Sequence, residues 1–486
     1  MSRGTKLGIA LVGSALALGV LGDALFQGQR LGVNVGIWTV AFAVALAGLL
    51  RVARAPLHQG RRFMVAPLVV FAALFAWHSS PLLVAANLLA LAAAVTMGAL
   101  RNARLRLRKA TLSDYGGGFV GAATSTAFGA LPLLMRDIRW QEVVGRARSE
   151  RVTAVARGVA LGLPLLLLFG GLFVAADAVF KQLVSSAVPS LVATVVERLL
   201  IIAVWTWLAG GLLRDLLASR ADDEEAPLAR PRKGLGPLEI GVALASLDVL
   251  FLAFVVVQFR YLFGGSAVVL ADTDLTYAEY ARHGFFELVV VAALTLSVLL
   301  LADWALVDRG RRMFRWLAAA LLVLLGVVIA SALQRMRLYM QHFGLTELRV
   351  YATGVIVWLA VVSAWFAVTV LRGRRHAFAM GALVAGFAAT FALNVLSPDA
   401  LIARTNVTRP VVDVSYLAGL SDDAVPTLVA RIRALPSSQR ALLARALLDR
   451  DVAVGDWRSW NVSRSRAADS LRAHRSELEA LVQPIP

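Results

Sequence analysis

Long apolar runs recur along most of the chain, and short polar connections separate them. A helix needs about 20 mostly apolar residues to cross roughly 30 Å of hydrocarbon, whereas a barrel strand needs only about ten alternating residues. The runs therefore predict an all-α polytopic membrane protein with about 11 transmembrane helices. The expected spans are 7–26, 31–50, 63–79, 81–100, 158–180, 198–214, 237–258, 284–304, 316–334, 349–371 and 377–396.

Basic residues gather in every second loop. The arginine-rich loops are 51–62, 101–109, 307–315 and 372–375, whereas 27–30 carries Arg30 alone. Short loops rich in Lys and Arg stay in the cytoplasm. The pattern predicts a cytoplasmic N-terminus, and eleven crossings then predict an extracytoplasmic C-terminus.

One apolar segment, 117–135, has basic stretches on both sides. If it crossed the bilayer, every later loop would change sides and the charge pattern would invert. We therefore expect it to be re-entrant or interfacial. The expected organisation is a membrane region of six spans at 1–214, a cytoplasmic linker at 215–236, a membrane region of five spans at 237–396, and a small helical extracytoplasmic domain at 397–486.

Composition strengthens this interpretation and excludes several chemistries. Hydrophobic residues make up 59% of the chain and charged residues 16%, against about 25% charged in soluble proteins. The net charge of +18 is concentrated in short loops, so it indicates membrane orientation and no nucleic-acid partner. Without cysteine, disulfides and iron–sulfur clusters are excluded, and the six histidines lack metal-ligand spacing. We expect no cofactor and no metal.

Polar residues concentrate in two expected outer connections of the last five spans, 260–287 and 335–351. A charged aspartate near mid-span, Asp248, costs about 2.5–3.5 kcal/mol to insert and is a functional candidate by default. The candidate polar pocket comprises Asp248, Arg260, Glu279, Arg282, Glu287, Arg335, Arg337 and Arg349. Three alternatives remain open: interfacial anchors, mutually neutralised charges that stabilise the fold, and, for the aspartate, a protonated or hydrogen-bonded carboxyl between helices.

Local rules add structural expectations near the same end of the spans. Gly344 can close the ninth helix, and Thr346 can cap the tenth. Asn87 and Asn394 lie within spans and are expected to form hydrogen bonds across helices.

Several strings resemble a bacterial membrane family, the domain of unknown function 4173, together with the related 4153 family. The strings are LGDALFQGQRLGVNV at 21–35, QFRYLFGG at 258–265, LTYAEYARHGFFEL at 275–288, RMRLYMQHFGLTELRVYA at 335–352, LNVLSPDALIARTNV at 393–407, SYLAGLSDDAVPTL at 415–428 and WRSWNVSRSRA at 457–467. The resemblance implies a polytopic protein with an extracytoplasmic tail and transfers no catalytic role. We expect it in the bacterial cytoplasmic (inner) membrane.

No catalytic signature occurs in the sequence. The leading hypothesis is non-enzymatic recognition, transport or signalling through an outward-facing polar pocket. Its partners would be the lipid bilayer and a small molecule, a lipid or an envelope protein. The alternative is a membrane-embedded transferase or hydrolase that acts on a lipid-linked substrate at the outer face.

Overall fold

The computed structural model describes most of the chain. The described ranges are 1–54, 59–98, 112–140, 142, 190–218, 235–263, 285–306, 310–374, 377–452 and 455–482, with isolated positions between 154 and 177. Within these ranges the secondary structure is helical, and extended pairing is limited to one β-bridge between Leu235 and Leu306. The predicted all-α class is confirmed.

Nine of the described helices are long and apolar enough to cross a membrane. They are α1 (Arg3–Phe26), α2 (Val33–Ala53), α4 (Pro81–Gly98), α10 (Ser190–Ala218), α11 (Pro237–Phe263), α14 (Phe285–Ala305), α15 (Arg311–Phe343), α16 (Glu347–Thr369) and α17 (Phe378–Leu396). A further predicted span corresponds to α3 (Gln59–Leu74), which has only 16 residues. The predicted span 158–180 falls almost wholly outside the described residues. The protein is a multi-pass membrane protein, while the total of eleven spans stays a prediction.

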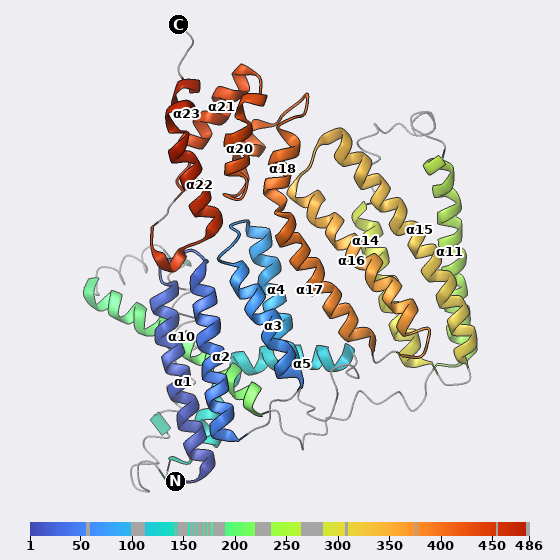
Figure 1. Cartoon of the computed structure of the whole chain (residues 1–486). Coiled ribbons are helices and arrows are strands. Elements are labelled where there is room, and N and C mark those ends of the chain that lie inside the picture. The colour runs from blue at the N-terminus through green and yellow to red at the C-terminus, as the bar shows by residue number, and fades with distance from the viewer. Residues whose placement is uncertain are drawn as a thin grey trace.

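The segment 117–135 forms a helix that is broken by a sharp bend. It comprises α5 (Leu112–Phe128), the single turn α6 (Ala130–Pro132) and the short π-helix η2 (Leu133–Asp137). The axis bends by 56° at the break near Gly129, and Figure 1 shows α5 lying across the long axes of its neighbours. A Cβ at Gly129 would lie 2.9 Å from the Cα of Gly211, so glycine permits this close packing on α10. Such a bend suits a broken span or a re-entrant loop, and the prediction stays open.

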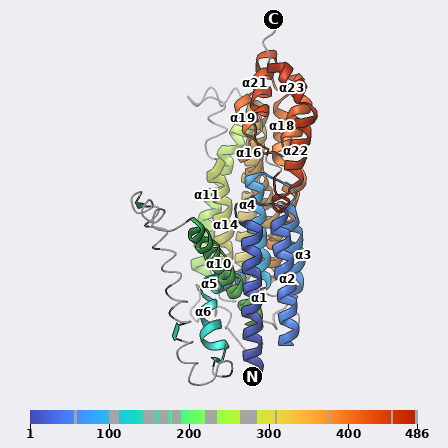
Figure 2. The ribbon, with the colours of Figure 1, turned by 90° about the vertical axis from the view of Figure 1, so that its left-hand side faces the viewer.

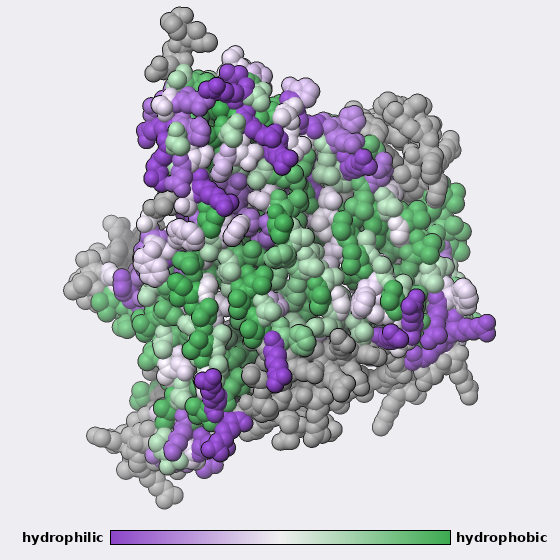
Figure 3. Space-filling model, in the orientation of Figure 1, coloured by the Kyte–Doolittle hydropathy of each residue, from purple (hydrophilic) through white to green (hydrophobic). Residues whose placement is uncertain are grey.

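The membrane region has two apolar cores. One unites α1 to α5 with α10 through side chains such as Leu18, Phe42 and Leu213. The other unites α11, α14, α15 and α16 through side chains such as Leu321 and Phe366. Figure 3 shows the apolar belt that these helices present, with hydrophilic residues gathered above it and at its lower ends.

A pair of buried amides joins α4 to α17 between the two cores. Asn87 Nδ2 donates to Asn394 Oδ1 over 3.1 Å, and Asn394 Nδ2 donates to Asn87 Oδ1 over 2.9 Å. Both side chains are buried, so each amide satisfies the other in apolar surroundings. The predicted hydrogen bonding of these asparagines across helices is confirmed.

Short helices form a separate core after the last span. They are α18 (Pro398–Asn406), α19 (Val414–Gly419), α20 (Val425–Arg431), the 3-10 turn η5 (Ile432–Ala434), α21 (Ser437–Leu448), the 3-10 turn η6 (Trp457–Ser459), α22 (Val462–Ala473) and α23 (Arg475–Val482). We call residues 398–482 the tail. Figures 1 and 2 show the tail at one end of the helix bundle and the N-terminus at the other. The prediction of a small helical C-terminal part is confirmed.

Candidate functional site

The tail contacts three separate turns at its end of the membrane region. These are the α1–α2 turn at 27–32, the α3–α4 turn at 75–80 and the α15–α16 turn at 344–346. Each turn exposes backbone carbonyls and N–H groups at helix ends that need hydrogen-bond partners. The tail supplies partners at all three.

At the α1–α2 turn, the tail backbone approaches the membrane region closely. Arg458 Nη1 donates to the Ala24 carbonyl over 2.6 Å, and the Val33 N–H donates to the Trp460 carbonyl over 3.0 Å. A Cβ at Gly32 would lie 2.5 Å from that Trp460 oxygen. Glycine at this position therefore allows the two backbones to meet.

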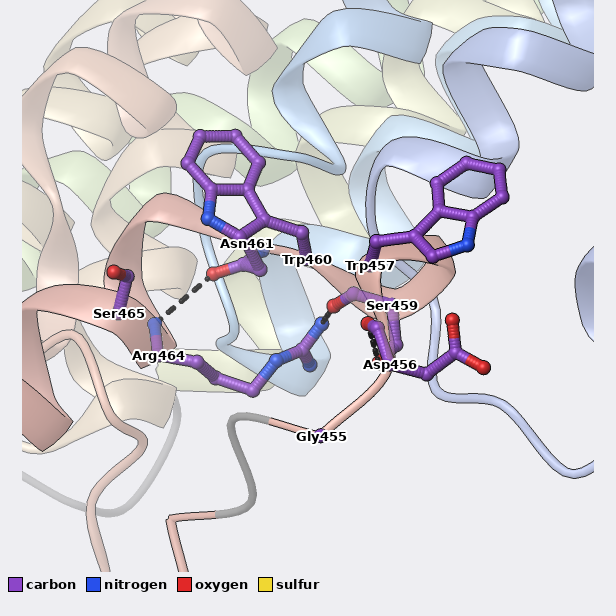
Figure 4. A pocket seen from close by; sticks show the side chains of 8 residues that line it. All are labelled: Gly455, Asp456, Trp457, Ser459, Trp460, Asn461, Arg464 and Ser465. Carbon is purple, nitrogen blue, oxygen red and sulfur yellow. Dashed lines mark hydrogen bonds between the residues drawn. The ribbon is translucent and has the colours of Figure 1, made fainter.

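A buried arginine completes the contact with the α1–α2 turn. Arg464 Nη2 donates to the Leu31 carbonyl over 2.8 Å and also to the Ser459 carbonyl. Figure 4 shows its guanidinium turned back toward Ser459, with Trp457 and Trp460 carried on the same turn. Burial lowers the pKa of Arg464, and the adjoining cavity is only about 60 Å³. Because its hydrogen bonds join a carbonyl of the α1–α2 turn to a carbonyl of the tail, Arg464 is a structural link between the tail and the membrane region.

At the α15–α16 turn, two tail side chains bind backbone groups of the membrane region. Asn406 exchanges two hydrogen bonds with the backbone of Leu345, at 2.9 Å and 2.8 Å. Arg409 donates to the carbonyls of residues 340, 341 and 342 near the end of α15. Gly344 closes α15 with φ +76°, as predicted.

The start of α16 is capped differently from the expectation. Thr346 occupies the N-cap position, but its side chain makes no capping hydrogen bond. The Glu347 N–H donates instead to the Tyr416 hydroxyl of the tail over 2.8 Å. The predicted threonine cap is correct in position and wrong in mechanism, because a distant residue supplies the acceptor.

At the α3–α4 turn, a single tail carboxylate collects several donors. Asp423 Oδ1 lies 2.9 Å from His78 Nδ1, and Asp423 Oδ2 accepts the N–H groups of Ser79 and Ser80 at 3.0 Å and 2.9 Å. The Ser421 hydroxyl also donates to Oδ2 over 3.1 Å. Burial raises the pKa of Asp423, but the His78 hydrogen bond and the other donors outweigh it and hold the pKa below its usual value.

The first turn of α22 fixes the same α3–α4 turn from another direction. Asn461 Nδ2 donates to the carbonyls of Phe75 and His78 at 2.7 Å and 2.8 Å. The Val462 N–H donates to the Ala76 carbonyl, and the Ser463 N–H to the Trp77 carbonyl. The position of the His78 ring is therefore fixed both by its own backbone and by its carboxylate partner.

A neighbouring aspartate behaves in the opposite way. Asp399, in the first turn of α18, is 1% exposed, and its Oδ2 accepts the Ser421 N–H over 3.2 Å. Its Oδ1 has no hydrogen-bond partner among the described residues. Burial raises the pKa of Asp399 above its usual value, and the nearby charge of Asp423 adds to this effect. The fold thus favours an ionised Asp423 beside a carboxyl that binds its proton more tightly than usual.

A cavity of about 640 Å³ lies between the α3–α4 turn, the end of α17 and the tail. Its polar lining includes side chains from all three elements, and its apolar lining includes large side chains that remain exposed at the surface. The lining residues are Leu74, Trp77, His78, Phe391, Asn394, Val395, Ser397, Ala400, Asp422, Asp423, Pro426, Thr427, Val462, Ser463 and Arg466.

The His78 ring presents one unused nitrogen. Its Nδ1 is held by Asp423, and the side chain is only 6% exposed. Within the described ranges, Nε2 has no hydrogen-bond partner. A carboxylate that fixes one ring nitrogen leaves the other free to accept or donate a proton to a bound molecule. This arrangement can bind a polar group or move a proton.

The candidate pocket predicted from the sequence lies elsewhere and is only partly described. Glu279 and Arg282 fall outside the described residues, and nothing is described of the Arg260 side chain, in α11. Asp248 lies within α11 with both carboxylate oxygens buried and without a partner in the described part of the chain. Glu287 is exposed in the first turn of α14.

The predicted arginines occupy the ends of α15 and α16. Arg349 stacks over the Tyr339 ring at 4.0 Å and donates to the Gly344 carbonyl over 2.7 Å. Arg337 is exposed, and Arg335 is half-buried. Arg349 thus serves the helix junction, whereas a pocket formed jointly by the predicted residues stays a prediction.

Sequence reasoning missed the pair that the fold brings together. His78 and Asp423 are separated by 345 positions, and neither lies in a recognisable local motif. One signal was present: two of the family-like strings, 415–428 and 457–467, contain Asp423, Asn461 and Ser463. These strings pointed to the tail side of the site, although not to its partner turn.

Comparison with models of known protein families shows which family the chain belongs to. A family model described as "Domain of unknown function (DUF4153)" matches residues 65–430. The chain belongs to the DUF4153 family. The resemblance had named 4173 first and 4153 as its relative, so the family prediction is confirmed with a small difference in name.

The DUF4153 match includes both members of the buried pair, His78 and Asp423, and ends before α22. No curated protein and no solved structure matches the chain. In the described part of the chain, no group of three or more His, Asp or Glu side chains could hold a metal ion.

Proposed function

We propose that this DUF4153 protein recognises an amphipathic, lipid-like molecule in the cavity between the α3–α4 turn, α17 and the tail. The observation that carries the proposal is the mixed polar and apolar lining of that cavity. His78, Thr427 and Arg466 form part of a polar side, while Leu74, Phe391 and Val395 extend along the membrane helices.

The exposed apolar part of the lining favours access from the bilayer. Trp77 is 50% exposed, Phe391 47% and Val395 72%. These side chains are large, and they continue the apolar belt of the spanning helices. A cavity of about 640 Å³ lies within the range of roughly 300–1,000 Å³ typical of ligand pockets. It is large enough for a lipid headgroup and the first part of its chains.

We place this cavity at the extracytoplasmic face. Arginines cluster at the opposite ends of the same helices, with Arg51 and Arg54 at the end of α2 and Arg311, Arg312 and Arg315 at the start of α15. Figure 1 shows these ends on the side of the N-terminus, away from the tail. Short arginine-rich ends favour the cytoplasm, and this supports the proposed orientation.

Recognition explains the site with fewer assumptions than catalysis. A transferase or hydrolase remains the second candidate because Asp423 orients His78 and leaves its Nε2 free, as a general base requires. The two functions differ in the fate of the ligand. A binding protein returns the lipid unchanged, whereas an enzyme converts it at a rate that falls when His78 is replaced by glutamine.

Native mass spectrometry of the purified full chain in lipid nanodiscs tests the proposal. We expect bound lipid on the wild type, and an unchanged lipid mass after incubation. Ala400→Trp should fill the cavity and reduce bound lipid by about tenfold, as expected for a loss of roughly 1.4 kcal/mol. Ala473→Trp, at an exposed position of α22, is the matched control. Equal lipid binding by Ala400→Trp and wild type, or no binding by either, would contradict the proposal.

A further inference from the structure

The charged residues that line the cavity support a more specific inference, which rests on the proposed function. Two aspartates belong to the lining, and both are already compensated. Asp422 Oδ1 accepts from Arg450 Nε over 3.0 Å, and the side chains are 13% and 20% exposed. Asp423 is satisfied by His78, by two backbone N–H groups and by Ser421. Both carboxylates therefore have hydrogen-bond partners, and that of Asp422 is a permanently charged arginine.

The lining also carries a positive charge, on Arg466 of the tail. Arg466 projects from α22, and its guanidinium lies 5.8 Å from the centre of the Trp77 ring. No carboxylate pairs with it among the residues that the structure describes. An arginine over an indole ring keeps its N–H groups free for an anion, and its planar fork matches phosphate or carboxylate oxygens.

His78 provides a second, independent indication of a ligand. Its side chain is more than nine-tenths buried, it lines the cavity, and its Nε2 has no partner in the described ranges. Nε2 is not sealed from solvent, so water or a ligand in the cavity can reach it. The Thr427 hydroxyl lines the same cavity and adds a neutral donor.

We propose that the cavity takes an anionic amphiphile, with its phosphate or carboxylate on Arg466 and on the Nε2–H of a doubly protonated His78, whose Nδ1–H is held by Asp423. The hydrocarbon chains then follow Leu74, Phe391 and Val395 into the bilayer. Trp77 lines the same cavity beneath the Arg466 guanidinium, and its amphipathic ring suits a membrane interface. Among sources of this chemistry, the exposed apolar lining favours a membrane lipid over free phosphate.

The test compares lipids that differ only in headgroup charge. Wild-type protein in nanodiscs is offered phosphatidylglycerol and phosphatidylcholine with identical acyl chains, and bound lipid is measured by native mass spectrometry. We expect a preference of about tenfold for phosphatidylglycerol, because only the anionic headgroup gives Arg466 a charge-assisted hydrogen bond without a competing ammonium group. Arg466→Gln should lose the preference while still binding phosphatidylcholine.

A matched control and a competitor separate the outcomes. Arg472→Gln removes an exposed arginine of the same helix, already paired with Asp469, and should keep the preference. Equal binding of both lipids by the wild type would overturn the anionic headgroup and leave the proposed function intact. Absence of both lipids would overturn the proposed function itself. Loss of bound phosphatidylglycerol on adding millimolar inorganic phosphate would overturn the choice of a lipid source.

Discussion

The α3–α4 and α15–α16 turns both hold the tail, but they use their polar groups differently. At the α15–α16 turn, Asn406 and Arg409 direct all their described hydrogen bonds to backbone groups. At the α3–α4 turn, Asp423 fixes the ring of His78, whose second nitrogen stays free beside a cavity of about 640 Å³. At the first turn, the hydrogen-bonding groups of Asn406 and Arg409 are used within the protein. At the second turn, Nε2 of His78 remains available for a hydrogen bond to a ligand.

This difference separates a structural junction from a candidate site. Polar residues at a membrane boundary are common, and their concentration alone does not indicate function. Arg349 illustrates this, because its donors are used at the end of α15. A buried group with unused hydrogen-bonding capacity, next to an open volume, is the more selective criterion.

The largest expected effect comes from removing the carboxylate at the α3–α4 turn. Asp423→Ala leaves His78 and the N–H groups of Ser79 and Ser80 without their acceptor in a buried position. We expect a loss of about 3 kcal/mol in the stability of tail docking. The measurement is the rate at which a protease cleaves the tail of the purified protein, together with the unfolding temperature in detergent.

The control for this variant is Asp469→Asn, which alters an exposed ion pair of α22 and should leave both readouts unchanged.

The contribution of Asp423 to tail docking also has a defined pH dependence. Its folded pKa lies below the ordinary value of 3.8, so the contribution is full above that value and is lost as the pH falls through the folded pKa. If the tail of Asp423→Ala docks as firmly as that of the wild type, the turn is held by Asn461 and by the N–H groups of Val462 and Ser463.

A smaller effect is expected at the α15–α16 turn. Asn406→Ala removes two hydrogen bonds to Leu345, and we expect a cost of about 1–2 kcal/mol in unfolding free energy. Because this turn does not line the cavity, lipid binding by the folded variant should equal that of the wild type. Chemical denaturation and native mass spectrometry of the same sample check both statements. Loss of bound lipid at full folding would remove the distinction between the two turns.

The sequence predicted the features that depend on local pattern. Apolar length predicted the nine described helices that are long enough to span a membrane, and Gly344 ended α15 as expected from its freedom to adopt a positive φ. Asn87 and Asn394 were correctly expected to bond across helices, since a polar amide within a span needs a partner. These inferences required only neighbours in sequence or the properties of the membrane.

The candidate site depends on contacts between distant segments, and local pattern does not encode these. His78 follows a short apolar helix, Asp423 lies in the tail, and only the packing of the tail brings them to 2.9 Å. The same limit explains the cap of α16, where the acceptor is Tyr416 and not the local Thr346. Residue spacing predicts helix faces, whereas the partner of a turn 345 positions away follows from tertiary structure.

The smallest expected effect lies beneath the α3–α4 turn, in the amide pair that links α4 with α17. Hydrogen bonds between membrane helices average about 0.6 kcal/mol each, so the reciprocal pair should give a coupling of about 1 kcal/mol. The measurement is a double-mutant cycle with Asn87→Leu and Asn394→Leu, read by unfolding in mixed micelles. Asn394 also lines the cavity and donates to the Thr390 carbonyl, so its single variant should cost more than that of Asn87. A coupling near zero would mean that α17 is positioned by the tail and by apolar packing, and that the cavity keeps its shape without the amide pair.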